Sequence, residues 1–228
     1  MNKIKPLFDK QCTCLLCQTK FTTKKLRTRF VKLNKMDSDF FPIYDEHNPL
    51  LYYINVCPAC GFSYSDDSSR YFAQESKMAL IEKVSSHWIP HSFDKERSIE
   101  DSIKTYKLAA YCASVRKEKH ITVAGLYLRI AWHYRMLNNT EQEIRFINLA
   151  LSEYETSYSI GDYQGTKVSE LRTIYLIADL SKRTNNLEKA TKFYSKVIEQ
   201  QNRTVETQIV KLAKESWQEM RDSQKTFI

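Results

Sequence analysis

The stretch IAWHYRMLNN at residues 130–139 recurs as IADLSKRTNN at residues 177–186. Each copy starts with apolar residues at helical spacing and ends in an Asn-Asn pair, and asparagine is a residue type that ends one helix and caps the next. A further apolar stripe follows each pair, so each copy predicts a helix, a short turn and a second helix. The recurrence indicates an array of paired helices.

The second copy also has the small and aromatic residues by which paired helices of tetratricopeptide repeats interlock. Ala178, Ala190 and Tyr194 stand at offsets of 12 and 16 residues, which match that pattern. Ala131 and Ala150 match part of it in the first copy. We therefore predict a tetratricopeptide-like helical repeat domain over residues 99–228.

The composition agrees with helices joined by polar turns. The 228 residues include only 4 Gly and 5 Pro, which argues against Gly-rich phosphate-binding loops and flexible Gly/Ser linkers. All five prolines precede residue 91, so the chain has two compositional halves. We predict a mainly α protein with a small β-rich, zinc-ribbon-like module at residues 1–65, a linker with a short helix at residues 66–98, and the repeat domain after it.

Five of the six cysteines lie in the first 60 residues, and four of these five form two CxxC pairs. The pairs are Cys14 with Cys17 and Cys57 with Cys60, and together they offer the four soft ligands of a tetrahedral Zn²⁺ site. Gly61 follows the second pair and can adopt the positive φ that a zinc knuckle needs. Gln18 stands at the matching place after the first pair, which predicts a weaker knuckle there.

Several alternatives to this zinc site follow from the same residues. Cys12 is a neighbouring thiol at a looser spacing from Cys17, so we expect it outside the ligand set. A closed four-cysteine set is typical of structural zinc, whereas catalytic zinc keeps an open position. A thiol redox or zinc enzyme is the third-ranked reading, because Cys57-Pro58-Ala59-Cys60 follows a predicted strand.

A basic ribbon occupies the sequence between the two cysteine pairs. Residues 20–35 contain seven Lys or Arg and no acid, within a chain of net charge +8. Lys24, Lys25, Arg27 and Arg29 are candidate contacts to a nucleic-acid backbone, which makes a nucleic-acid-associated factor the alternative function. Just downstream, Asp37 and Asp39 flank Ser38, and we expect these carboxylates to cap a turn.

The order of these motifs resembles a bacterial family catalogued as domain of unknown function 2225. The resemblance rests on the two CxxC pairs, the segment at residues 37–40, the Asn-Pro-Leu at residues 48–50, and the Leu128–Arg135 stretch. It implies a cytoplasmic protein with an N-terminal CxxC segment and tetratricopeptide-like helices, and it implies Cys14, Cys17, Cys57 and Cys60 as the metal ligands. It implies no activity.

The first helix of each pair would line a groove that binds a protein or peptide partner. The candidate groove residues are aromatic or cationic and suit an acidic peptide: Lys107, Tyr111, Trp132, Arg135, Tyr175, Lys182 and Arg183. We found no catalytic motif and expect a non-catalytic interaction adaptor. The chain has no apolar run near the ~18 residues of a membrane span, so we expect a cytoplasmic protein without membrane contact.

Overall fold

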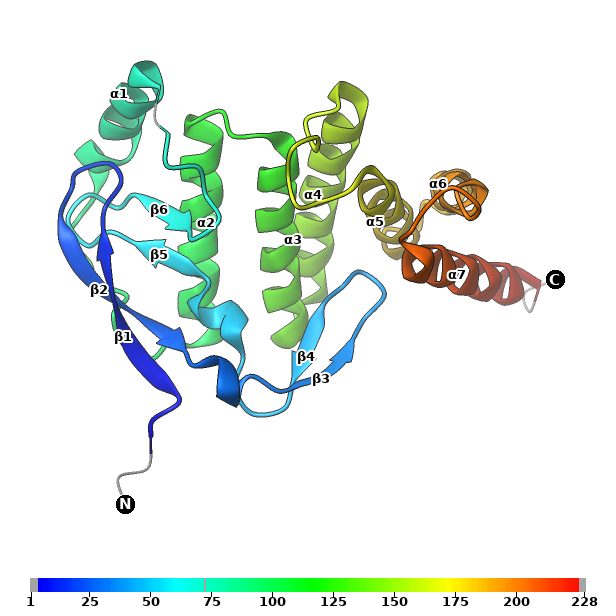
Figure 1. The fold of residues 1–228 in the computed structure, drawn as a ribbon, viewed down its shortest axis with the longest axis horizontal. Coiled ribbons are helices and arrows are strands. Elements are labelled where there is room, and N and C mark those ends of the chain that lie inside the picture. The colour runs from blue at the N-terminus through cyan, green and yellow to red at the C-terminus, as the bar shows by residue number, and fades with distance from the viewer. Residues whose placement is uncertain (1–3, 72, 226–228) are drawn as a thin grey trace. The chain divides into compact units, whose positions relative to one another are not determined.

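The computed structural model describes residues 4–71 and 73–225 of the protein. Of the residues that the structure describes, 54% are helical, which confirms the mainly α fold predicted from the sequence. In the described part of the chain the helices are α1 (Gln74–Lys83), α2 (Ile99–Val115), α3 (His120–Met136), α4 (Thr140–Ile160), α5 (Glu170–Arg183), α6 (Leu187–Glu199) and α7 (Thr207–Lys225) (Figure 1).

The N-terminal part contains short antiparallel strand pairs, as predicted. Strands β1 (Leu7–Thr13) and β2 (Lys20–Leu26) form the longest ladder, whose register runs from Leu7 opposite Leu26 to Thr13 opposite Lys20. β3 (Leu33–Met36) pairs with β4 (Pro42–Tyr44), and β5 (Ile54–Val56) pairs with β6 (Ser63–Ser65). The turn of the first ladder and the turn of the third ladder each contain one of the CxxC pairs.

The described residues divide into two compact units, and each is interleaved along the sequence. Unit 1 lies within Met1–Met36, Pro42–Glu118 and Trp132–Asn139, and unit 2 lies within Asp37–Phe41, Lys119–Ala131 and Thr140–Ile228. The β3–β4 loop belongs to unit 2 because it packs with α5, and the end of α3 belongs to unit 1 because it packs with α2. The domain boundaries at residues 65 and 98 stay a prediction.

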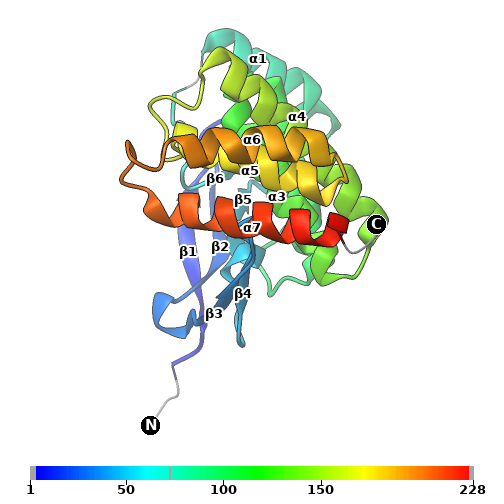
Figure 2. The ribbon, with the colours of Figure 1, turned by 90° about the vertical axis from the view of Figure 1, so that its right-hand side faces the viewer.

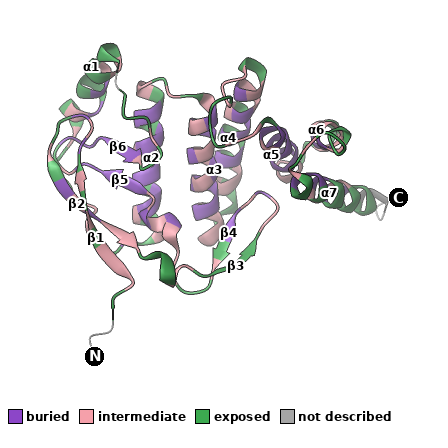
Figure 3. Cartoon of the chain, in the orientation of Figure 1, coloured by how far each residue is buried: buried purple, intermediate pink, exposed green. Residues whose placement is uncertain are grey.

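Unit 1 has its core between α2 and the third ladder. α2 begins with a capping box between Ser98 and Asp101 and packs against β5 and β6, so its inner face is buried (Figure 3). The apolar side chains of this core surround the cysteines. They include Leu16, Phe21, Phe62, Leu80, Val84 and Cys112.

A buried arginine joins the segments of unit 1. Arg97 is only 4% exposed, and its five N–H groups donate to four acceptors. These acceptors are the carbonyl oxygens of Phe93, Leu51 and Ile54 and the hydroxyl of Thr23, at 2.9 to 3.2 Å. Burial lowers the pKa of Arg97 to about 10.

Unit 2 is held together by the faces of α5, α6 and α7, which lie side by side (Figure 2). Ala178, Ala190 and Tyr194, which the repeat pattern selected, are all fully buried in this core. Small residues at 178 and 190 let α5 and α6 approach closely enough for the tyrosine ring to fill the remaining space. The burial of these three residues between α5 and α6 is therefore what the sequence pattern predicts.

The two Asn-Asn turns share one backbone geometry. Asn138 and Asn185 both adopt the left-handed region, with φ of 54° and 60°. In each turn the next asparagine donates its backbone N–H to the carbonyl five residues earlier, at 3.0 Å for Asn139 and 2.9 Å for Asn186. This is the hydrogen-bond pattern of a Schellman motif, for which asparagine is the best residue after glycine.

Candidate metal centre

Two knuckles of the same backbone shape present the four cysteines. In the first, the N–H of Gln18 donates to the carbonyl of Cys14 at 3.1 Å, and in the second, the N–H of Gly61 donates to that of Cys57 at 2.9 Å. Each knuckle is closed by a backbone hydrogen bond from the N–H of its first cysteine, from Cys14 to the carbonyl of Thr19 and from Cys57 to the carbonyl of Phe62. The sequence therefore folds twice into the same tight turn.

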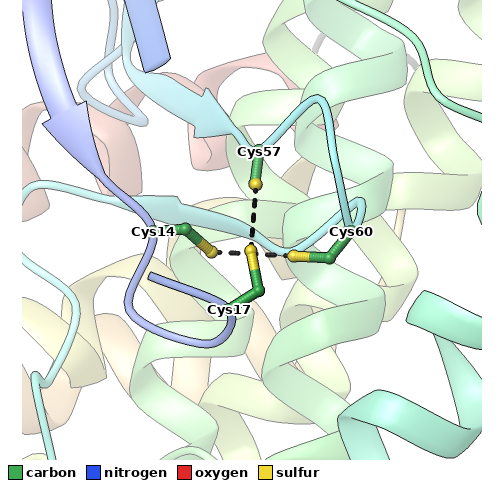
Figure 4. A group of neighbouring side chains, drawn as sticks. All are labelled: Cys14, Cys17, Cys57 and Cys60. Atoms are coloured by element: carbon green, nitrogen blue, oxygen red, sulfur yellow. Dashed lines mark hydrogen bonds between the residues drawn. The ribbon is translucent and has the colours of Figure 1, made fainter. Parts of the chain in front are cut away.

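The four sulfur atoms of these knuckles converge on one point (Figure 4). All four lie within 4.8 Å of one another. Sγ of Cys14 is 3.6 Å from Sγ of Cys60, and Sγ of Cys17 is 3.6 Å from Sγ of Cys57. Cys14, Cys57 and Cys60 are buried, while Cys17 is exposed and also contacts the Thr19 hydroxyl at 3.2 Å.

This donor set fits a tetrahedral metal ion. Four sulfurs at a Zn–S distance of about 2.3 Å lie about 3.8 Å apart along the edges of a tetrahedron. The observed 3.6 Å separations are close to that value. The four cysteines predicted from spacing are thus brought together as a set, and sulfur-only coordination is typical of Zn²⁺ and of iron–sulfur centres.

The first knuckle has the same geometry as the second, although the sequence suggested that it would be weaker. Gln18 adopts φ of 62°, close to the 71° of Gly61. A side chain in this left-handed region costs about 1–2 kcal/mol, a cost that glycine does not have. The weakness expected from Gln18 is therefore backbone strain and not a different turn.

Sequence reasoning missed a tryptophan that covers the second knuckle. Trp88 was expected to be a linker residue, yet its indole Nε1 donates to the carbonyl of Pro58, inside the CxxC turn, at 2.9 Å. Behind the knuckle, the N–H of Ser63 donates to the buried sulfur of Cys112 at 3.4 Å. The glycine at position 61 was the one signal that a large group could lie here, because it leaves room above the turn.

The sulfurs influence one another's protonation. Hydrogen bonds from the neighbouring Cys14 and Cys60 thiols lower the pKa of the Cys57 thiol far below its ordinary value. The same hydrogen bond with Cys57 raises the pKa of Cys14. A metal ion binds these cysteines as thiolates, so metal binding releases protons and its affinity depends on pH.

Cys12 lies outside this set, as expected. It is half-buried on β1, opposite Phe21 of β2. Burial raises the pKa of its thiol, so it is a weaker nucleophile than an exposed cysteine.

The basic ribbon corresponds to β2 and the residues after it, and its candidate contacts have partners within unit 1. Lys24 pairs with Asp9 at 2.7 Å, and Lys25 pairs with Asp66 at 3.3 Å while donating to the carbonyl of Tyr52. The guanidinium of Arg27 lies over the ring of Phe8 and that of Arg29 over Phe30, at 5.0 and 4.9 Å.

The predicted groove residues fall into both units, and those of unit 1 differ in exposure. Trp132 is buried, Arg135 is half-buried and Tyr111 is half-exposed. Lys107 donates to the hydroxyl of Tyr134 at 2.8 Å. Whether Lys107, Tyr111, Trp132 and Arg135 share one binding surface with the residues of α5 stays a prediction.

The three groove residues of unit 2 lie on α5, and two of them bind a segment of this same chain. The Tyr175 hydroxyl donates to the carbonyl of Ser38 at 2.8 Å, and Arg183 contacts Asp37 and Asp39. Lys182 instead pairs with Glu219 at 3.0 Å. Nothing in the sequence indicated that Tyr175 and Arg183 contact an acidic segment of the same chain.

Asp37 and Asp39 also cap their own turn, as expected. The N–H of Ser38 donates to Asp37 at 2.8 Å, and the N–H of Phe41 donates to Asp39 at 3.2 Å. These local bonds hold the two carboxylates in place for Arg183.

Comparison with known proteins places the chain in a family. The sequence model of the family described as "Uncharacterized protein conserved in bacteria (DUF2225)" matches residues 7–220. Neither the search of curated proteins nor the search of solved structures gave a match. Within the described residues, no helix combines the length and the apolar character needed to cross a membrane. Since the match covers most of its length, the chain belongs to this family, as the resemblance had implied.

Proposed function

We propose that this member of the DUF2225 family is a non-catalytic, zinc-stapled adaptor whose tetratricopeptide-like helices bind a protein partner in the cytoplasm. The proposal has two parts, a structural Zn²⁺ held by the four cysteines and a peptide-binding face on the helices. The observation that carries it is the convergence of four sulfurs from two knuckles that are about forty residues apart in the sequence, Cys14 and Cys17 with Cys57 and Cys60.

The donor set supports a structural metal. Four thiolates complete a tetrahedral zinc coordination sphere and leave no position for a substrate or a water molecule. The ion would join the β1–β2 turn to the β5–β6 turn, in a lobe whose strands are only three to seven residues long. Such a lobe has little core of its own, and metal binding then contributes directly to its folding free energy.

The α5 face supports a peptide-binding role. Tyr175 and Arg183 already contact an acidic segment of the chain, residues 37–41, through hydrogen bonds and ion pairs. Arg-to-carboxylate hydrogen bonds are charge-assisted, and clusters of arginine are a recurring means of recognising acidic peptide motifs. A face that binds such a segment in the same chain has the chemistry to bind one from another protein.

The alternative, a nucleic-acid-associated factor, has less support. Lys24 and Lys25 are engaged by Asp9 and Asp66, and a phosphate would have to compete with these carboxylates. Arg27 and Arg29 are the better candidates on this ribbon, because their guanidinium groups lie over the aromatic rings of Phe8 and Phe30.

Metal analysis tests the first part of the proposal. Purified chain is expected to contain one zinc ion, measured by plasma mass spectrometry, and Cys57→Ser is expected to lose it and to unfold at a lower temperature. Cys12→Ser is the matched control, since Cys12 lies outside the cluster, and it should keep the metal. Protein free of zinc that melts at the same temperature with and without added Zn²⁺ would refute a structural zinc.

Partner capture tests the second part. Immobilised chain is exposed to cytosol from its source cells, in parallel with variants Arg135→Glu and Lys182→Glu and with Lys192→Glu as a control on exposed α6. A partner lost with the first two variants and kept with the third supports the adaptor. Recovery of salt-sensitive RNA or DNA instead, lost on neutralising Lys24, Lys25, Arg27 and Arg29 together, would favour the alternative.

A further inference from the structure

Residues Asp37–Phe41, which we call the acidic loop, form a ligand-like segment on the surface of α5. The loop joins β3 to β4, and yet it belongs to unit 2 while both strands belong to unit 1. Within unit 2 it contacts α5 through backbone, carboxylate and aromatic groups. Its contacts are those of a bound peptide more than those of a plain hairpin turn.

The polar contacts centre on Arg183 at the end of α5. Its guanidinium is 3.2 Å from Asp37 and 3.6 Å from Asp39, and it donates to the hydroxyl of Ser38 at 2.8 Å. One turn earlier on the helix, Asp179 holds the same guanidinium at 3.0 Å and is itself 1% exposed. Asp179 also accepts a hydrogen bond from Tyr194 at 3.2 Å. Asp179 thus fixes the position of the Arg183 guanidinium, and the remaining N–H groups of this guanidinium face the loop.

Aromatic contacts complete the binding face. The ring of Phe40 packs against that of Tyr175, with centroids 5.3 Å apart, and the guanidinium of Arg172 lies 3.9 Å from the centre of the Phe40 ring. Tyr175 donates its hydroxyl to the carbonyl of Ser38 as well. Tyr175, Asp179 and Arg183 recur every four residues, so they form one continuous stripe along α5.

The loop occupies this stripe at a conformational cost. Phe40 has φ of 64°, a left-handed conformation that is strained for a bulky residue. The hairpin imposes this geometry, because the chain must turn back within five residues to reach β4. A linear peptide with the same side chains is free of that requirement, whereas the loop has the advantage of being covalently attached.

We propose that the Tyr175–Asp179–Arg183 stripe of α5 is a recognition site for an acidic, aromatic peptide of the form Asp-x-Asp-Phe, and that the acidic loop is its resident ligand. A protein partner with such a segment exposed displaces the loop and takes its place. This inference rests on the adaptor function proposed above and specifies the chemistry of the partner: two carboxylates for Arg183, followed by an aromatic ring for Tyr175 and Arg172.

A synthetic peptide copied from the loop tests the proposal directly. The probe is fluorescein-labelled KMDSDFFPI, the sequence of residues 35–43, and its binding to the full-length zinc-loaded chain is followed by fluorescence anisotropy. The control peptide KMNSNFFPI lacks both carboxylates. We expect the probe to bind, the control peptide to bind at least about tenfold more weakly, and Arg183→Gln to abolish binding while Lys192→Gln, an exposed position on α6, preserves it.

Weakening the resident loop should strengthen binding of the probe. The Asp37→Asn, Phe40→Ala double variant populates the open face more than the wild type, so its apparent affinity for the probe should rise by about tenfold or more. A folded double variant that binds no better than the wild type would overturn the proposal.

Hydrogen exchange on the wild-type chain gives a test that needs no variant. Saturating unlabelled KMDSDFFPI should speed amide exchange in residues 36–42 and leave α6 unchanged. Unchanged exchange in the loop overturns the proposal, as does loop release that accompanies dimer formation without peptide binding, which would assign the face to a second copy. Partner capture that depends on Lys182 and Arg135 while the peptide fails would refute this inference and leave the adaptor function standing.

Discussion

The indole of Trp88 lies directly against Gly61. A Cβ placed at position 61 would come within 2.5 Å of two indole carbons, which is closer than Cβ atoms approach non-bonded atoms in folded proteins. The same indole donates to the carbonyl of Pro58, three residues earlier. The tryptophan and the glycine are therefore a matched pair, and together they shield the second knuckle from water.

Replacing this glycine should damage the zinc site more than backbone strain alone can explain. Gly165 is the natural control, because it has φ of 73° against 71° for Gly61 and nothing within 4 Å of its Cβ position. Gly165→Ala should cost about 1–2 kcal/mol through its φ alone. Gly61→Ala adds the clash with Trp88 and should both lower the melting temperature further and increase zinc loss to a chelator. Equal effects of the two changes would contradict the packing described here.

The opposite change at the first knuckle should stabilise the protein. Gln18 has φ of 62° and its side chain is exposed, so Gln18→Gly removes the strain and loses little packing. We expect the free energy of unfolding to rise by up to about 1 kcal/mol. This is a net value, because glycine also has greater freedom in the unfolded chain. Urea unfolding of the zinc-loaded protein measures it. A fall in stability would mean that the Gln18 side chain contributes more than its backbone costs.

Two neighbouring cations on α5 should differ sharply in their effect on stability. Arg183 contacts the buried carboxylates of Asp39 and Asp179, and Arg183→Met would leave them without this cation, at a cost of about 3–5 kcal/mol. Lys182 pairs with Glu219, whose side chain is 71% exposed, so Lys182→Met should cost less than about 1 kcal/mol. Thermal unfolding of both variants makes the comparison, and similar losses would argue against the buried cluster.

Arg97→Lys should destabilise unit 1 although the charge is kept. The guanidinium uses all five N–H groups, whereas an ammonium has three, and the loss of two buried hydrogen bonds costs about 2–4 kcal/mol. Arg97→Leu removes the charge as well and leaves more carbonyl groups unpaired. Hydrogen exchange at β5, next to the carbonyl of Ile54, reports whether the loss is local.

The thiol of Cys112 should resist alkylation in the native protein. Burial raises its pKa to about 11, so at pH 8 only about one molecule in a thousand carries the reactive thiolate. Iodoacetamide should modify Cys112 slowly at pH 8, and rapidly once urea unfolds the chain and restores the ordinary pKa. Peptide mass mapping gives the rates. Native modification of Cys112 as fast as that of Cys12 would show that the core opens readily.

The parts of the structure that could be predicted are those set by local spacing. Two residues between cysteines define a knuckle wherever they occur, so Cys14, Cys17, Cys57 and Cys60 could be grouped without knowledge of the fold. The same holds for Ala178 and Ala190, because helical periodicity places both on the inner face of one pair. Asn138 and Asn185 share a turn for a similarly local reason.

The parts that escaped prediction depend on contacts between distant segments. Arg183 and Asp37 are separated by nearly 150 residues, and nothing near either of them in the sequence indicates the other. Trp88 lies beside Pro90, which is typical of a linker, and its place on Gly61 follows only from the path of the chain after α1. The sequence indicated that Gln18 is less favourable than glycine at this turn, but it did not show the two backbone hydrogen bonds that hold the turn in the same shape as the second knuckle.

The interleaving of the two units also determines when each can be completed during synthesis. Unit 1 needs residues up to Asn139, so the ribosome must translate well past the second cysteine pair before that unit has all its parts. Unit 2 needs the acidic loop, which emerges about eighty residues before Lys119, where the next segment of that unit begins. For the same reason no single cut in the gene separates the units, and truncated expression products that end near residue 65 or start near residue 99 would each lack pieces of the unit they were meant to isolate.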